Sequence, residues 1–266
     1  AGLGALAALM AMVREQDAFI VVGPAIDLLW TVVGERRWRL IVRALAGAAV
    51  AAAAYLPQAA AYLLINGHLG PSRLVSRKMT WTAPHALEVV CSTEHGLIWW
   101  TPLALAAMAG IGLLAAGAGA APGAAADCGN RRSAARIGAG LAAIVLLQIY
   151  IAGSVESWTV AGAFGQRRFV ALTAPFVIGL AVVGARLASV RARTAAAALA
   201  AVCVWWNLGL MVQFGAGLMD RQRLELRRNA YNTFIEVPQR LPELAHRYLF
   251  DRASFYRPAA PGRGPG

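Results

Sequence analysis

The sequence predicts an all-α fold, a polytopic transmembrane helical bundle of about six to seven spans followed by a polar C-terminal tail. Of its 266 residues, 59% are hydrophobic and only 14% are charged, and the mean hydropathy is +0.55. Soluble domains are closer to half apolar and a quarter charged, so this composition indicates a membrane protein. Long apolar runs separated by short polar connections give the same indication along the chain.

Seven apolar runs are predicted as membrane helices, each of which needs about 20 mostly apolar residues. They cover residues 1–13, 18–33, 41–65, 96–117, 136–153, 168–189 and 194–219. We expect the first run to be the end of a truncated span, because the chain opens with apolar residues and no initiator methionine. Alanine and glycine dominate the runs, which suits close helix packing in lipid. The runs lack the polar stripe of soluble amphipathic helices.

The connections between the runs predict an orientation in a bacterial inner (cytoplasmic) membrane. "GERRWR" (34–39), "DCGNRRSAAR" (127–136) and "ARLASVRAR" (185–193) are short, basic and alternate along the chain, so the positive-inside rule places them in the cytoplasm. The other connections are then external: residues 14–17, 66–95 and 154–167, and the tail from Asp220. The Ala- and Gly-rich segment 114–126 is predicted to be a flexible cytoplasmic loop.

Three parts of the chain are distinguished by composition. Residues 1–219 form the predicted bundle, and residues 220–258 form an external polar tail with short helices broken by Pro238 and Pro242. Residues 259–266, "AAPGRGPG", are predicted to be disordered.

The formal net charge of +12 raises the question of an anionic partner. The basic residues stand in short clusters between apolar runs and match no nucleic-acid module, so anionic lipid or lipid phosphate is the predicted partner and nucleic acid is not. Cys91, Cys128 and Cys203 are far apart and odd in number. Neither a metal site nor a disulfide framework is therefore expected.

Two adjacent arginines occur in "GAFGQRRF" (162–169), at the predicted start of a membrane helix. Gly165 and Gly162 remove side-chain bulk before a helix predicted to begin near Arg168. A helix N-terminus favours an anion, and the forked guanidiniums of Arg167 and Arg168 match phosphate oxygens. The pattern therefore predicts a phosphate site. The alternative is a pair of arginines that reach to lipid headgroups.

Three further polar residues lie at predicted external helix ends. In "STEHGLIWW" (92–100), His95 is either a donor to a phosphate or sugar hydroxyl or a structural residue, and Glu94 is either a general base or a solvated charge. Arg14 in "MVREQD" (12–17) either pairs locally with Glu15 and Asp17 or serves a site at the outer end of two helices.

The stretches "STEHGLIWWTPLALAAMAGIGLL" and "SWTVAGAFGQRRFVALTAPFVIGLA" resemble bacterial polytopic glycosyltransferases of the GT-C class, of the protein-mannosyltransferase and aminoarabinose-transferase type. The resemblance covers most of residues 1–255. It implies transfer of a sugar from a polyprenyl-phosphate carrier to a glycan, lipid or protein acceptor at the outer face. The lipid-linked sugar is the substrate, and no cofactor is assigned. Arg167 and Arg168 would stabilise the departing lipid phosphate, with His95 as a helper.

The family's catalytic acid lies in an external loop upstream of the point where this sequence opens. The resemblance therefore assigns no base, and we expect the chain to lack it unless Glu94, the one acid beside a motif, takes that role. Two alternatives stay open at this stage. A transporter or flippase would need ionisable residues within its spans, whereas the charges here lie at the ends. A non-catalytic membrane assembly subunit is the other alternative.

Overall fold

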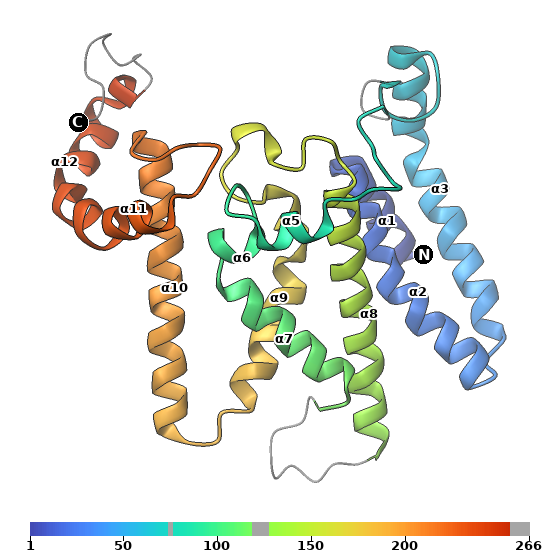
Figure 1. The fold of residues 1–266 in the computed structure, drawn as a ribbon. Coiled ribbons are helices and arrows are strands. Elements are labelled where there is room, and N and C mark those ends of the chain that lie inside the picture. Colours follow the sequence, from blue (N-terminus) through green and yellow to red (C-terminus); the bar gives the residue numbers. More distant parts are fainter. Residues whose placement is uncertain (74–76, 119–127, 256–266) are drawn as a thin grey trace.

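The computed structural model describes residues 1–73, 77–118 and 128–255, and every named element within these ranges is a helix (Figure 1). One isolated antiparallel bridge joins Met79 to Val155. The all-α prediction is thus confirmed for the described residues. Most of the predicted loop 114–126 and the whole of the predicted disordered terminus 259–266 lie outside these ranges.

Five helical stretches are long and apolar enough to cross a membrane, and two apolar helices are shorter. The five are η1–α2–η2 (Glu15–Val21, Val22–Leu29 and Trp30–Gly34), α3 (Arg39–Asn66), α8 (Cys128–Gly153, apolar from Arg131), η4–α9 (Arg167–Leu172 and Thr173–Ala185) and α10 (Val190–Ala216). The shorter two are α1 (Gly2–Val13) and α7 (Leu103–Ala115). The remaining elements are α5 (Ala86–Cys91), α6 (Leu97–Trp100), η3 (Val160–Gly162), α11 (Leu226–Tyr231), η5 (Asn232–Glu236), α12 (Val237–Phe250) and η6 (Arg252–Phe255).

The prediction of one continuous span over 96–117 is wrong. The chain forms a single turn, α6, breaks at Thr101 and Pro102, and then forms the 13-residue α7. Steric clash with the proline ring disfavours helical dihedrals for the residue before it. Thr101 accordingly has non-helical dihedrals, with φ −139° and ψ 77°. Helix α7 alone is about 20 Å long, shorter than the roughly 30 Å of bilayer hydrocarbon.

The predicted basic connections gather at one end of the molecule. In Figure 1 the α2–α3 connection, the N-terminal end of α8 and the α9–α10 connection all lie at the bottom. The segments before α5 and after α8, and the helices of the tail, lie at the opposite end. This alternation matches the one expected from the positive-inside rule, although which end is external stays a prediction.

Glycines bring the helix backbones into direct contact. A Cβ atom built on Gly110 of α7 would overlap the carbonyl of Gly179 of α9, and one on Gly4 of α1 would overlap the carbonyl of Gly47 of α3. Neither position has room for a side chain. The close approach expected from the glycine-rich composition is therefore present at these two crossings.

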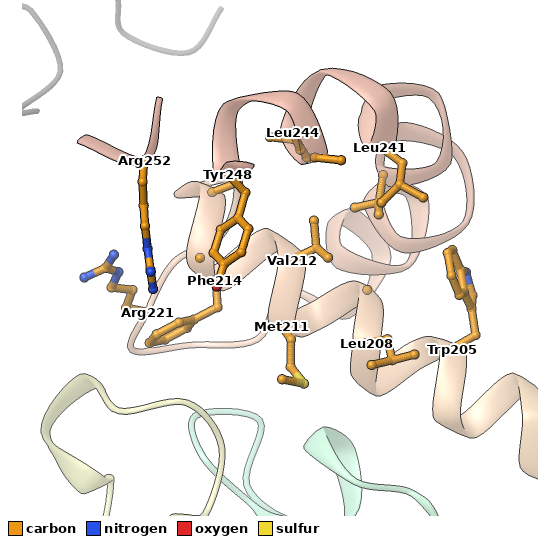
Figure 2. A pocket seen from close by; sticks show the side chains of 15 residues that line it. Trp205, Leu208, Met211, Val212, Phe214, Arg221, Leu241, Leu244, Tyr248 and Arg252 are labelled. Carbon is orange, nitrogen blue, oxygen red and sulfur yellow. The ribbon is translucent and has the colours of Figure 1, made fainter. Parts of the chain in front are cut away.

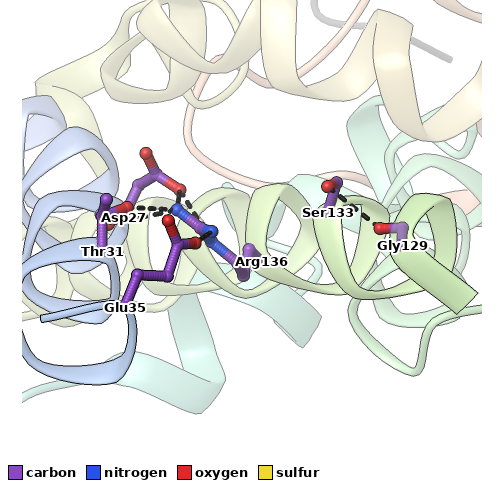
Figure 3. Close-up of polar contacts among 6 residues, drawn as sticks. All are labelled: Asp27, Thr31, Glu35, Gly129, Ser133 and Arg136. Atoms are coloured by element: carbon purple, nitrogen blue, oxygen red, sulfur yellow. Dashed lines mark hydrogen bonds and ion pairs between the residues drawn. The ribbon is translucent and has the colours of Figure 1, made fainter. Parts of the chain in front are cut away.

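An ionic network holds α8 to α2 at the basic end of the molecule (Figure 3). The Arg136 guanidinium donates to the carboxylate of Asp27 at 2.7 Å and to that of Glu35 at 2.6 Å, and it also contacts the Thr31 hydroxyl. The predicted connection 127–136 is largely helical, because α8 begins at Cys128. Part of the basic charge there is thus used in packing.

The tail is docked on the end of α10 through buried polar groups. The Gln213 amide donates to the Thr233 hydroxyl at 2.8 Å, and Asn229 donates back to the Gln213 carbonyl oxygen at 2.9 Å. All three side chains are buried. Because unpaired polar groups in such a place are costly, the network fixes the register between α10 and the tail.

The predicted break at Pro242 is wrong, because α12 runs through it without interruption. The predicted break at Pro238 is also wrong, because η5 leads directly into α12 and Glu236 and Val237 both have right-handed helical dihedrals. Pro242 removes one backbone hydrogen bond from the helix interior. The buried Val237 and Leu244 side chains hold α12 in place on both sides of it, so packing outweighs the lost bond.

Candidate functional site

Arg168 is fixed against the backbone that precedes η4. Its guanidinium donates to the carbonyl of Trp158 at 3.2 Å and to that of Ser157 at 3.0 Å. Its own carbonyl accepts a 2.8 Å hydrogen bond from Gln148, a buried residue of α8. The planar group is therefore oriented before any ligand arrives, with part of its donor set already satisfied by carbonyl groups.

Arg14 joins this place from the other end of the chain. Its Nη1 donates to the carbonyl of Arg167 at 3.0 Å, across 153 residues of sequence. With the Gln16 amide turned so that its oxygen faces donors, that oxygen accepts from Nε and Nη2 of Arg14 and from Gln148, each at 3.2 Å. Helix ends that are remote in sequence thus meet at one polar junction.

We call Arg14, Arg167 and Arg168 the arginine cluster. The positive charges of Arg14 and Arg167 act on Arg168 at short range. Within residues 1–73, 77–118 and 128–255 none of the three forms an ion pair with a carboxylate. Arg167 is exposed and its guanidinium has no protein partner there. The carboxylate of Asp17 couples to the cluster, since the charge of Arg14 acts on it without forming an ion pair. Three like charges with so little compensation favour an anion between them.

Two carboxylates follow Arg14 on the η1 turn, yet they do not pair with it. Glu15 and Asp17 are each partly buried, and one oxygen of each is shielded from solvent without a hydrogen-bond partner. No hydrogen bond or ion pair joins Arg14 to either carboxylate among the described residues, although the charge of Arg14 acts on Asp17. Arg14 instead contacts the residues that the motif "GQRRF" brings from the far side of the bundle.

The predicted helix N-terminus does not lie at the arginines. Arg167 and Arg168 open the six-residue 3-10 turn η4, and the α-helix α9 begins only at Thr173. The favourable effect of a helix dipole falls off within the first turn, so it contributes little at Arg168. Side-chain donors, more than helix N–H groups, make this site cationic.

The segment that supplies the two carbonyl groups is strained. Val160 has a φ of +59°, a left-handed conformation that is unfavourable for a β-branched residue. Its side chain is only 2% exposed, and its N–H donates to the Ser157 carbonyl at 3.0 Å. Such strain costs on the order of 1–3 kcal/mol and persists only where surrounding contacts enforce it. The position of the Ser157 and Trp158 carbonyls is therefore enforced by packing.

His95 is buried in the protein close to Gly165, three residues before Arg168. Its side chain is completely buried and stacks on Trp100, with ring centroids 5.2 Å apart and planes inclined by 8°. Neither ring nitrogen has a well-formed hydrogen bond among the described residues. Burial lowers the pKa of His95, and backbone groups of Arg221 and Gly165 close to the ring oppose this more weakly. The imidazole is thus neutral at physiological pH.

Gly165 connects the two motifs. Its φ of +51° lies in the left-handed region, which glycine adopts without strain. The residue is buried, and a Cβ there would lie 3.8 Å from the Trp100 side chain. Phe164 beside it meets Trp100 edge to face at 5.2 Å. The turn at Gly165 therefore seats the arginine pair against the residues that enclose His95.

Glu94 is exposed, and its carboxylate has no hydrogen bond or ion pair among the described residues. Its backbone is held, because Trp100 Nε1 donates to the Glu94 carbonyl at 3.1 Å and the Glu94 N–H donates to the Ser92 hydroxyl. A carboxylate on a fixed backbone, open to solvent, is able to take a proton from an approaching acceptor.

The sequence singled out every member of the arginine cluster, but it missed Gln16 and Gln148, which orient the cluster. Neither glutamine belongs to a motif; Gln148 is a polar residue in an apolar run, whereas Gln16 stands in the polar connection 14–17 and gives no such signal. Among the residues that the structure describes, no group of three histidine, cysteine or acidic side chains is placed to hold a metal ion. Comparison with protein families, curated proteins and solved structures gives no match for this chain.

Proposed function

We propose that the chain belongs to a membrane glycosyltransferase of the GT-C type and binds the phosphate of a lipid-linked sugar at the arginine cluster. The observation that carries the proposal is the meeting of Arg14, Arg167 and Arg168 without an ion-paired carboxylate, where membrane-length helices begin and end. The proposed place of action is the outer face of a bacterial inner membrane. The sugar acceptor is a glycan, a lipid or a protein.

A phosphate fits the cluster for electrostatic and geometric reasons. Guanidinium groups donate pairs of parallel hydrogen bonds to phosphate oxygens, and these charge-assisted bonds are about twice as strong as neutral ones. Near the hydrocarbon boundary the dielectric constant is lower than in water, which strengthens the attraction. Since Arg168 is already oriented by the carbonyls of Ser157 and Trp158, little reorganisation is needed on binding.

In the proposed reaction an acceptor hydroxyl oxygen attacks the anomeric carbon of the sugar. The bond from that carbon to the phosphate oxygen breaks, and its electron pair leaves with the lipid phosphate. Negative charge grows on the phosphate in the transition state, so the fixed guanidiniums stabilise that state more than the ground state. The acceptor proton passes to a carboxylate, for which we propose Glu94.

His95 and Gly165 have supporting roles in this proposal. Because His95 is neutral and enclosed, it adds no charge at the phosphate. It holds Trp100, against which the Gly165 turn packs, and this packing sets the direction of the arginine pair. Both residues are therefore positioning residues.

The test is binding of a short prenyl phosphate to the purified chain in phosphatidylcholine nanodiscs. Farnesyl phosphate is the probe, and farnesol is the matched ligand without the phosphate. Replacing both Arg167 and Arg168 by alanine should weaken farnesyl phosphate binding by about tenfold to hundredfold, since each hydrogen bond to a charged group contributes about 1.5–3 kcal/mol. Farnesol binding should not change.

The matched control is Arg191→Ala, which removes one exposed arginine at the opposite end of the molecule. Its affinity for farnesyl phosphate should equal that of the unaltered chain. Equal binding of farnesol and farnesyl phosphate would exclude a phosphate site. Sugar transfer is then measured for the unaltered protein and for Glu94→Gln. Phosphate binding with no sugar transfer by either protein would favour the assembly-subunit alternative.

A further inference from the structure

A cavity lies between α10 and α12 and shares no lining residue with the arginine cluster. Its volume is about 720 Å³, within the roughly 300–1,000 Å³ typical of ligand sites. The walls are mostly apolar and aromatic, and they include Trp205, Leu208, Met211, Phe214, Leu241 and Tyr248. The lining residues of α10 belong to its C-terminal half, nearest the tail, and α10 is long enough to cross a membrane.

Two arginines mark one end of this cavity. Figure 2 shows Arg221 and Arg252 at the end formed by Phe214 and Tyr248, with Trp205 and Leu208 toward the opposite end. The Arg221 guanidinium lies 5.1 Å from the Phe214 ring centre, and that of Arg252 lies 4.9 Å from the Tyr248 ring centre. Within the described ranges neither arginine forms an ion pair with a carboxylate.

Asp220, the acid next to Arg221 in sequence, forms no ion pair with it among the described residues. The Asp220 carboxylate accepts a 2.8 Å hydrogen bond from the backbone N–H of Gln222. The arginines of α12 are arranged differently, because Arg240 pairs with Glu236 and Glu243, and Arg247 pairs with Glu243. Arg221 and Arg252 thus differ from their neighbours in the tail by facing an apolar cavity without a carboxylate partner.

An apolar cavity with a cationic end matches an amphiphile with an anionic head. Leu208, Met211 and Tyr248 remain 46%, 50% and 55% exposed, so their apolar surface is left for a hydrocarbon chain to cover. We propose that this cavity binds an anionic phospholipid of the surrounding membrane, with an acyl chain along α10 and its phosphate between Arg221 and Arg252. The inference is independent of the proposed glycosyl transfer.

The experiment is lipid retention by the purified full chain, measured by native mass spectrometry after mixing with equal amounts of phosphatidylglycerol and phosphatidylcholine. The unaltered chain should retain phosphatidylglycerol preferentially. Changing Arg221 and Arg252 together to alanine should reduce that preference roughly thirtyfold, because one basic residue near a lipid surface contributes about 1 kcal/mol. The matched control is the pair Arg223→Ala and Arg227→Ala, two exposed tail arginines that do not line the cavity.

A second variant tests the apolar part of the site. Gly215 lines the cavity and has open space around its Cβ position, so Gly215→Phe should fill the cavity without displacing its neighbours. It should reduce retention of both lipids. Gly184→Phe is the control, since Gly184 of α9 also has open space but does not line the cavity. Thermal unfolding of each variant verifies that the fold is intact.

Three results would overturn the inference. The first is equal retention of the two lipids by the unaltered chain, and the second is unchanged preference in the Arg221 and Arg252 variant. The third is displacement of phosphatidylglycerol by a lower concentration of farnesyl phosphate, with loss of this effect in the same variant. That outcome would assign the cavity to the prenyl carrier instead of a membrane phospholipid.

Discussion

Arg168 forms hydrogen bonds that stabilise the preceding backbone, and it also contributes a positive charge to the arginine cluster. Two of its N–H groups are bonded to the carbonyls of Ser157 and Trp158, and those bonds set the plane of the guanidinium. An arginine that only reached to lipid headgroups would have no need of this arrangement, and a lysine could replace it. Arg168→Lys therefore separates the two interpretations that the sequence left open.

We expect Arg168→Lys to be damaging, because an ammonium cannot reproduce a planar fork held by two carbonyls. If the side chain stabilises a departing phosphate, the loss should be about 3 kcal/mol, or near a hundredfold in the rate of sugar transfer. Farnesyl phosphate affinity should fall in the same variant. Arg191→Lys provides the reference for a conservative change at an exposed arginine, and full activity in Arg168→Lys would refute the phosphate role.

His95 should make stability depend on pH in one direction. Its pKa in the folded chain is lowered by burial below the ordinary value of 6.5, so below that pH the unfolded state binds the proton more readily. The free energy of unfolding should therefore be highest above pH 6.5 and should fall as the pH decreases, by at most about 1.4 kcal/mol per pH unit for one proton.

The measurement is thermal unfolding in detergent between pH 5 and pH 8, compared with His95→Gln. Glutamine does not titrate, so the variant should lose the part of the acid destabilisation that belongs to His95. Its melting temperature should also be lower at pH 8, because the stacking on Trp100 is altered. An identical pH dependence in the two proteins would show that His95 does not have the lowered pKa.

At the scale of helices, the packing depends on glycines at crossings. A Cβ atom on Gly179 of α9 would overlap the backbone of Ala107 in α7, whereas one on Gly184 of the same helix meets no atom within 4 Å. Gly179→Ala should therefore force the two helices apart and destabilise the chain by about 1–3 kcal/mol. Gly184→Ala should have little effect, and the two melting temperatures are compared in the same detergent.

The contrast between these two glycines is what makes the result decisive. Both changes add the same methyl group to α9, so any general effect of alanine on helix propensity is shared. A larger loss in Gly184→Ala than in Gly179→Ala would contradict the α7–α9 crossing described above. An equal small loss would mean that the crossing tolerates a wider separation.

The elements were predictable from sequence where hydropathy alone decides them. The runs that became α3 and α10 were found because uninterrupted apolar sequence of that length has few alternatives in a membrane protein. The run 96–117 misled the prediction, since the averaged hydropathy is insensitive to the local effect of Pro102 on Thr101. At Pro242 the error was opposite, because burial of α12 outweighs the missing hydrogen bond.

The candidate site was predictable only in part. The arginine pair and Gly165 share one short motif, so their proximity follows from the sequence. The contact of Arg14 with the Arg167 carbonyl joins residues 153 positions apart, and no local pattern reports such a distance. The burial of His95 under Trp100 depends in the same way on tertiary packing.

Over the whole molecule, basic residues occur at both ends of the bundle, and at each end some have a carboxylate partner while others among the described residues do not. At one end Arg136 is held by Asp27 and Glu35, so its charge is neutralised within the protein. At the other end Arg240 is paired with Glu236, whereas Arg167 and Arg221 have no carboxylate partner among the described residues. The predicted orientation places this end outside, where the positive-inside rule expects few basic residues, so we propose that anionic ligands account for these two arginines.

The predicted orientation of the bundle gives a labelling pattern that can be tested in intact cells with a membrane-impermeant maleimide. Cys91 is exposed and lies at the end predicted to be external, so a chain in which Cys128 and Cys203 are replaced by serine should be labelled from outside. Arg191 lies in the first turn of α10, at the end of the molecule opposite to Cys91. In a cysteine-free background, Arg191→Cys should react only after the membrane is permeabilised. The two positions are expected to differ because the basic connections stay in the cytoplasm. Labelling of Arg191→Cys in intact cells, with Cys91 protected, would reverse the orientation and place the arginine cluster on the cytoplasmic face. A carrier phosphate would then have to be bound from inside the cell, and the proposal of sugar transfer at the outer face would fall with it.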